Sequence, residues 1–392
     1  MPSQNPLFSY ENLRTVMTFL DPLVRLKLSR QCSSLRYLHN MVPMKIQYLR
    51  ITPSDFKIND TTYKIGIIRK YINGKNPINV EEENARGGFQ YDTDQYGIRR
   101  DQFRGNEEIR RVLEWLRAFK DNADYPFSMY VQLLIIPDEG PRKVECLVYN
   151  KTLQEVKDSW MLKLFGTNVP IHVQNLDVGE IYQTHYFPQM SEVLKFPYFP
   201  LETSKLKVSN LNINWVIWET LNAIRPVLDG SPLKMFKTDC SRNIPNDPII
   251  QESKFLNITG NSQFWILMRF SNERIHLEEC NFTEEDVSNV AKHWKNMKET
   301  KGKHFSMGFK EGKDVVTLLN MFKGLPGAKN RVLKETRSTT FPECVILPIR
   351  ENSELTVYCE TPESRDADYC DTQWIARIKI QPKGFVDNLF ID

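Results

Sequence analysis

Residues 275–294 read "IHLEECNFTEEDVSNVAKHW" and combine a short strand with a helix. Leu277 and Cys280 are expected to face inward from the strand, and Thr283 is a good residue to cap a following helix. Apolar residues then recur at helical spacing, at Val287, Val290 and Trp294. One such unit is too small to bury its apolar side alone, so it predicts neighbours of the same kind.

Similar strand-like pieces occur along residues 200–330, namely "KLKVSNLNI", "LKMFKTDC", "KFLNITG" and "HFSMGF". Each piece has one apolar residue at an equivalent position of the repeat. These residues are Leu206, Phe236, Leu256, Ile275 and Phe305, and they are separated by 30, 20, 19 and 30 residues. Strand-plus-return units of this size predict parallel neighbouring strands in a leucine-rich-repeat-like solenoid. The alternative is an α+β domain whose strands happen to be evenly spaced.

The rest of the chain is also mixed α and β. Strand-like "TTYKIGIIRKYI" and a hairpin of "SMYVQLLII" and "KVECLVYN" lie in the first half. Helices are expected after Asn106 and after Thr152, which forms a capping box with Glu155. Near the end, "ECVILPI", "LTVYCE" and "WIARIKI" predict a β meander that caps the solenoid. The predicted fold class is α+β, with a helical hairpin at 1–44, a mixed α/β domain at 45–199, leucine-rich-repeat-like repeats at 200–330 and the meander at 331–392.

Residues 7–38, "LFSYENLRTVMTFLDPLVRLKLSRQCSSLRYL", predict two amphipathic helices separated at Asp21-Pro22. The first helix has an apolar stripe of Leu13, Val16, Met17 and Leu20. The second has a stripe of Val24, Leu28, Cys32, Leu35 and Leu38, with Arg25 and Lys27 among the residues on its other side. About forty residues bury too little surface to fold alone, so these stripes need a partner.

Composition narrows the function classes. The formal charge of +3, with 41% hydrophobic and 26% charged residues, is ordinary for a globular protein and gives no reason to expect nucleic acid or a membrane as partner. The seven cysteines never form a C-x-x-C pair, and the chain opens with no apolar leader. We therefore expect reduced thiols and a cytoplasmic or nuclear location.

Catalytic and metal-binding motifs are missing from the sequence. There is no Walker or dinucleotide glycine loop and no H-E-x-x-H motif, and the six histidines are dispersed. Asp92 and Asp94 with Gly97 lack the later acidic ligand of a calcium loop, so an Asp-stabilised turn is expected there. The sequence predicts no catalytic residue, no metal and no cofactor, and hence no enzyme. An enzyme of unrecognised class is the distant alternative.

The segment "ENLRTVMTFLDPLVRLKLSRQCSSLRYL" resembles an F-box, with an apolar first helix, an L-D-P turn and a second helix rich in Arg, Leu and Cys. Other stretches, including "INDTTYKIGIIRKY", "GGFQYDTDQYG", "KLFGTNVPIHVQNL" and "NFTEEDVSNVAKHW", resemble a nematode-expanded family of F-box-like proteins with C-terminal domains of unknown function.

This resemblance implies a substrate-recognition adaptor without catalysis of its own. The F-box would bind the adaptor protein of a cullin–RING ubiquitin ligase, and the C-terminal domains would bind an unknown protein target. The implied adaptor-binding residues are Leu13, Val16, Met17, Leu20, Pro22, Leu28 and Leu35. If so, the stripe of the first helix should be exposed in the isolated chain. The alternatives are a hairpin that packs on its own domain, and a protein-binding module of the same architecture with no ligase docking.

Overall fold

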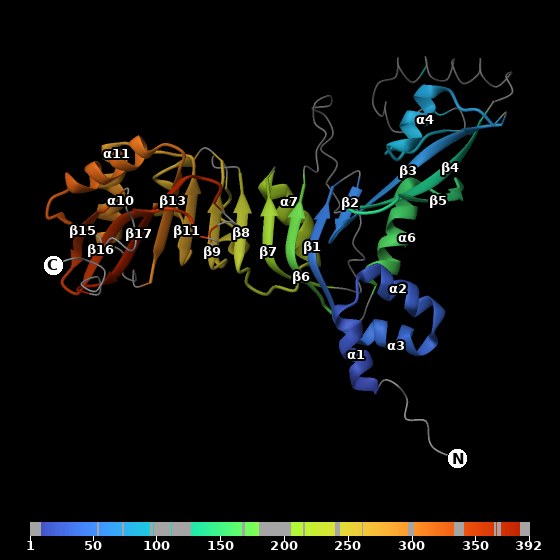
Figure 1. The fold of residues 1–392 in the computed structure, drawn as a ribbon, viewed down its shortest axis with the longest axis horizontal. Coiled ribbons are helices and arrows are strands. Elements are labelled where there is room, and N and C mark those ends of the chain that lie inside the picture. Colours follow the sequence, from blue (N-terminus) through green and yellow to red (C-terminus); the bar gives the residue numbers. More distant parts are fainter. Residues whose placement is uncertain are drawn as a thin grey trace. The chain divides into compact units, whose positions relative to one another are not determined.

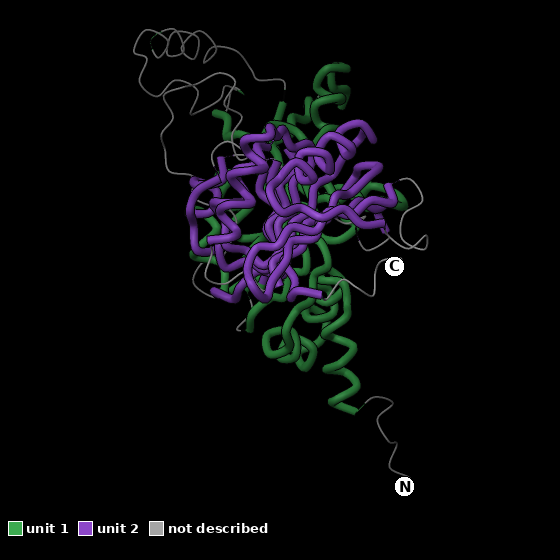
Figure 2. The backbone as a smooth tube through the Cα atoms, turned by 90° about the vertical axis from the view of Figure 1, so that its left-hand side faces the viewer, with its two compact units in different colours: residues 1–207, 223–229 green, residues 208–222, 230–392 purple. Residues whose placement is uncertain are grey.

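The computed structural model describes residues 9–52, 55–72, 74–94, 97, 111, 127–166, 169–179, 205–214, 216–239, 244–260, 262–296, 302–332, 341–363, 366 and 370–384. Figure 1 labels the helices and strands, and Figure 2 shows the two compact units into which the chain divides. Unit 1 comprises residues 1–207 and 223–229, and unit 2 comprises residues 208–222 and 230–392. The four-part division expected from the sequence is finer than these two units and stays a prediction.

Three helices open unit 1, namely α1 (Tyr10–Phe19), α2 (Pro22–Gln31) and α3 (Ser33–Met41). The side chain of Asp21 caps α2, with Pro22 in the first helical position. The prediction of only two helices is wrong because Cys32 has an extended backbone (φ −136°, ψ 125°) that separates α2 from α3. A continuous helix from 22 to 41 would be about 30 Å long and would carry Leu38 away from α1. The break returns α3 to α1.

Unit 1 continues with a mixed sheet in the order β6-β1-β2-β3-β4-β5. β1 runs parallel to β6, and the other neighbours are antiparallel. On the sheet, Trp160 of α6 packs against Phe56 and Tyr63, with ring centroids 4.7 and 5.2 Å away. The strands and helices are β1 (Met44–Ile51), β2 (Asp55–Ile58), β3 (Thr61–Tyr71), α4 (Ile78–Ala85), β4 (Phe127–Pro137), β5 (Lys143–Val148), α6 (Leu153–Phe165) and β6 (Ile171–Val178).

Several sequence predictions for unit 1 are confirmed. The β4–β5 hairpin is antiparallel, and Thr152 and Glu155 form the predicted capping box at the start of α6. Asp92 accepts hydrogen bonds from Tyr149 Oη and from the Leu153 N–H, both at 2.7 Å, so it holds its loop to the start of α6; the Asp-stabilised turn expected around Asp92 and Asp94 stays a prediction. The helix predicted after Asn106 lies outside the described residues, apart from position 111.

Unit 2 contains a run of parallel strands, in the order β7-β8-β9-β11-β13, except for residues 206–207 of β7, which are counted in unit 1. These are β7 (Leu206–Ile213), β8 (Met235–Thr238), β9 (Phe255–Ile258), β11 (Arg274–Glu278) and β13 (His304–Phe309). Phe236, Leu256, Ile275 and Phe305 are register partners across successive strands, as the repeat predicted. The fifth equivalence is wrong, since Leu211 pairs with Phe236 in place of Leu206. Both leucines of β7 are buried, so the apolar pattern alone does not distinguish them.

Helices follow these strands along the chain, and they are α7 (Ile217–Ile224), α8 (Pro248–Gln251), α9 (Ile266–Arg269), α10 (Glu284–Asn296) and α11 (Gly312–Lys323). Trp294 of α10 stacks on Phe305 of β13 with ring centroids 4.5 Å apart, so α10 covers the face of the sheet that carries Phe305. The predicted cap at Thr283 is present, because its hydroxyl accepts the Asp286 N–H. Cys280 does not face inward from β11; Glu279 has a φ of 53°, and the turn places Cys280 in β12 (Cys280–Asn281), beside β10 (Ser262–Gln263).

The C-terminal meander is confirmed. β14 (Lys329–Val332), β15 (Glu343–Arg350), β16 (Ser353–Glu360) and β17 (Trp374–Pro382) are consecutive antiparallel neighbours. β17 also pairs antiparallel with β13, so the meander continues the parallel strands as one mixed sheet. The chain is therefore a mixed α+β protein with a large mixed sheet, as the predicted class requires.

Candidate functional site

The predicted docking stripe of α1 does not face outward as a whole. We call residues 9–43, which contain α1, α2 and α3, the helical segment. Within it, Met17 is fully buried and packs with Leu38 and Val42. Leu13, Leu20 and Leu35 are partly buried against that cluster. The expectation that the whole stripe is exposed is therefore wrong, because α3 returns to cover it.

The other predicted docking residues differ in their surroundings. Val16 is 44% exposed, Pro22 is buried at the start of α2, and Leu28 is partly buried. Of the predicted set, Val16 alone is classed as exposed, so it is the residue with the most surface to offer a partner.

Arg25 lies at the centre of the helical segment, although the sequence pattern placed it on the polar side of the second helix. Its side chain is fully buried and donates to carbonyl oxygens at the ends of α1 and α3. The acceptors are Met17 O and Pro43 O, each at 3.1 Å, His39 O at 2.6 Å, and Val42 O. Helix ends leave carbonyls without intrahelical partners, and the guanidinium satisfies them. Burial lowers the pKa of Arg25 to about 10.

His39 completes this arrangement as an acceptor. Its Nδ1 accepts a hydrogen bond from Arg25 Nε at 3.1 Å, which requires a neutral ring. Burial and the neighbouring guanidinium lower the pKa of His39 to about 4. Arg25 and His39 therefore act together to hold the three helices in place.

A set of large apolar side chains remains exposed on the same three helices. Phe19 is 70% exposed and Tyr37 60% exposed. We call the set the helical surface, and its members are Tyr10, Val16, Phe19, Val24, Tyr37 and Met41. Tyr37 and Met41 are four residues apart and share one face of α3, while Val16 and Phe19 share one face of α1. Contiguous exposed apolar residues mark an interaction site more often than scattered single residues do, and these two pairs each place two such residues side by side.

The helical segment also contacts the rest of unit 1. α1 packs on β1, α2 packs on α6, and Lys45 Nζ lies 4.5 Å from the centroid of the Phe19 ring. These contacts fit the alternative in which the helices form a layer of their own domain.

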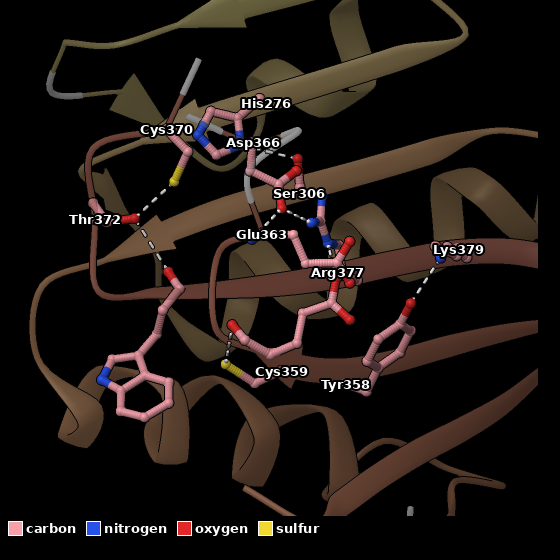
Figure 3. Close-up of polar contacts among 12 residues, drawn as sticks. His276, Ser306, Tyr358, Cys359, Glu363, Asp366, Cys370, Thr372, Arg377 and Lys379 are labelled. Carbon is pink, nitrogen blue, oxygen red and sulfur yellow. Dashed lines mark hydrogen bonds and ion pairs between the residues drawn. The ribbon is translucent and has the colours of Figure 1, made fainter. Parts of the chain in front are cut away.

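A second polar site lies inside unit 2, on strands β16 and β17 (Figure 3). Arg377 is buried between two carboxylates, with Nε 2.7 Å from Glu360 Oε1 and Nη2 2.7 Å from Asp366 Oδ2. Paired in this way, a charged group can stay inside a protein. Nearby, Lys379 donates to Tyr358 Oη at 2.7 Å.

Beside Arg377, the structure brings together His276, Glu278 and Cys370, with one donor atom of each within 4.8 Å of the others. Burial, helped by Arg377, lowers the pKa of His276 to about 3. No metal-binding motif is visible in the sequence here because Cys370 is almost a hundred residues from β11. The only available signal was the i, i+2 spacing of His276 and Glu278, which places both on one face of a strand.

Comparison with known proteins adds one match. Residues 158–311, from α6 to just beyond β13, match the family model described as Domain of unknown function (DUF3557). Searches of the curated proteins and of the solved structures found no significant match. Among the described residues, no helix has both the length and the apolar character needed to cross a membrane.

Proposed function

We propose that this protein is a non-catalytic substrate-recognition adaptor. Its N-terminal helices would bind the adaptor protein of a cullin–RING ubiquitin ligase, and unit 2 would bind a protein target. The observation that carries the proposal is the helical surface, which stays exposed after Met17, Leu38 and Val42 have formed a small core. The segment thus has its own interior and an apolar exterior left for a partner.

The F-box resemblance of this segment supports a specific partner. The L-D-P turn of the motif corresponds to the end of α1 and the cap of α2, where Asp21 accepts the N–H groups of Leu23 and Val24. On this reading the chain belongs with the nematode-expanded F-box-like proteins, and the ligase adaptor covers the helical surface. Burying one large apolar side chain contributes about 1.5–3 kcal/mol, so a few of these residues suffice for a stable contact.

Unit 2 supports the role of target receptor. Its parallel strands keep one register from Phe236 to Phe305 and are followed by helices, which supports the interpretation of this part as a leucine-rich-repeat-like solenoid. Solenoids of this kind bind proteins through an extended surface without requiring chemistry. All six described cysteines are free thiols, which agrees with a cytoplasmic or nuclear place for such a complex.

The test is a pull-down of the full chain with the ligase adaptor, using Phe19→Glu and Val16→Glu. Both side chains are exposed, so each variant should lose adaptor binding while its thermal unfolding stays within about 0.5 kcal/mol of the wild type. Leu147→Glu is the matched control, because Leu147 is a comparably exposed apolar residue of β5 in the same unit. Wild-type chain that brings down neither adaptor nor cullin would rule the proposal out.

A second candidate function is a protein-binding module without ligase docking. The contacts of α1 with β1 and of α2 with α6 favour it, together with Lys45 over the Phe19 ring. In that case Phe19→Glu changes stability and leaves capture of the target by unit 2 intact. The same pull-down and unfolding measurements therefore separate the two candidates.

A further inference from the structure

Three metal-binding side chain types meet in the interior of unit 2. The His–Glu–Cys cluster consists of His276, Glu278 and Cys370, which are 0%, 8% and 7% exposed. Imidazole, carboxylate and thiolate are the ligands that proteins use for Zn²⁺. The first two come from one face of β11, and Cys370 comes from the segment that leads into β17. The cluster therefore joins two parts of unit 2 that are far apart in the sequence.

We propose that the His–Glu–Cys cluster binds one Zn²⁺ ion, which fastens Cys370 and the residues that lead from it into β17 to β11. Zinc bonds of about 2.0–2.3 Å at tetrahedral angles place donors roughly 3.3–3.8 Å apart. The donor atoms lie within 4.8 Å of one another, so each pair must draw together by about 1.5 Å at most. Rotation about the side-chain bonds of Glu278 and Cys370 supplies a movement of this size. Three protein ligands leave the fourth position for water or another small donor.

Each ligand already has a partner that orients it. His276 Nδ1 lies 2.9 Å from Ser306 Oγ, which assigns Nε2 to the metal. Glu278 Oε1 accepts the backbone N–H of Asp371 at 2.6 Å, and Cys370 Sγ lies 2.9 Å from Thr372 Oγ1 (Figure 3). Outer partners of this kind fix the ring orientation and the tautomer of ligands in metal sites. The cluster is thus arranged before any ion binds.

The charge of the ligand set suits a buried position. One Zn²⁺ with a thiolate, a carboxylate and a neutral imidazole gives a site with no net charge, which avoids the cost of burying an unpaired ion. On binding, the thiol proton of Cys370 leaves to solvent as the zinc–sulfur bond forms. The proposal does not depend on the adaptor function, since it concerns the interior of unit 2 alone.

The test is titration of the metal-stripped full chain with Co²⁺ alone, under reducing conditions. Cobalt in a tetrahedral site with a thiolate ligand gives a sulfur-to-metal charge-transfer band and visible d–d bands. We expect one Co²⁺ per chain, displaced by one Zn²⁺. Cys370→Ser should abolish the charge-transfer band, whereas Cys344→Ser, which alters a buried thiol of β15 outside the cluster, should leave it unchanged.

Ser306→Ala provides a test that keeps all three ligands in place. Loss of the hydrogen bond to His276 should weaken Co²⁺ binding about 10- to 100-fold, with the stoichiometry unchanged. If circular dichroism shows that Cys370→Ser does not fold, the Co²⁺ affinity of Ser306→Ala tests whether the cluster binds the metal. The proposal is overturned if folded wild-type chain gives no charge-transfer band, if the band survives in folded Cys370→Ser, or if Ser306→Ala binds Co²⁺ as tightly as the wild type.

Discussion

Replacing Arg25 with Met should open the N-terminal helices locally. The guanidinium donates to four carbonyl oxygens and to His39 Nδ1, all within the helical segment. Methionine fills a similar volume but leaves these acceptors without a donor. Individual hydrogen bonds to a charged group contribute about 1.5–3 kcal/mol, but loss of the buried charge returns part of that sum. We therefore expect a net loss of about 4 kcal/mol in the stability of the segment.

Hydrogen–deuterium exchange of residues 9–42 measures this loss in the full chain. A change of 4 kcal/mol corresponds to exchange about 1,000-fold faster in the three helices, with unit 2 unaffected. Arg25→Lys should fall between, because an ammonium group keeps the charge but not the planar fork of donors. Arg30→Met is the control, since Arg30 is exposed on the same helix. Equal exchange in Arg25→Met and Arg30→Met would refute the structural role given to Arg25.

Three further predictions concern buried groups. When the pH falls below 6.5, His39 takes up a proton in the unfolded segment, but in the folded segment it does so only near pH 4. The stability of the segment should therefore fall by about 3 kcal/mol between pH 6.5 and pH 4. His39→Asn should remove this pH dependence, and an unchanged profile in that variant would contradict the prediction. Arg377→Met should cost about 3–5 kcal/mol in urea unfolding of unit 2, because two buried carboxylates lose their partner; a neutral effect would show that they are protonated or hydrated. Trp294→Ala should cost about 3–5 kcal/mol through the cavity left against Phe305, and a loss below 1 kcal/mol would contradict the packing of α10 on β13.

The repeat in unit 2 was predictable because each strand carries its own signal. Alternating apolar residues marked β11 and β13, and Thr283 marked the start of the helix between them. Strand identity and the cap are local properties, and they were confirmed. The register of β7 could not be predicted from its own residues. Leu206 and Leu211 are both buried, and only the pairing of β7 with β8 distinguishes them.

The candidate sites depended on contacts that periodicity does not contain. The apolar stripe continues through Cys32, so the pattern did not reveal the break that lets α3 cover Met17. An arginine that lies off the apolar stripe of a helix is expected at the surface, and Arg25 is buried only because helix ends converge on it. Cys370 meets His276 through the pairing of β13 with both β11 and β17, which no spacing in the sequence announces.

The antiparallel pairing of β17 with β13 has a consequence for folding during synthesis. As the chain leaves the ribosome, β7 to β13 can assemble one after another, but the outer edge of β13 has no partner until residues 374–382 emerge. An unpaired strand edge is a template for association with other chains. Release of the nascent chain before β17 has emerged should therefore give aggregates through β13, and chaperone demand should peak in this interval of translation.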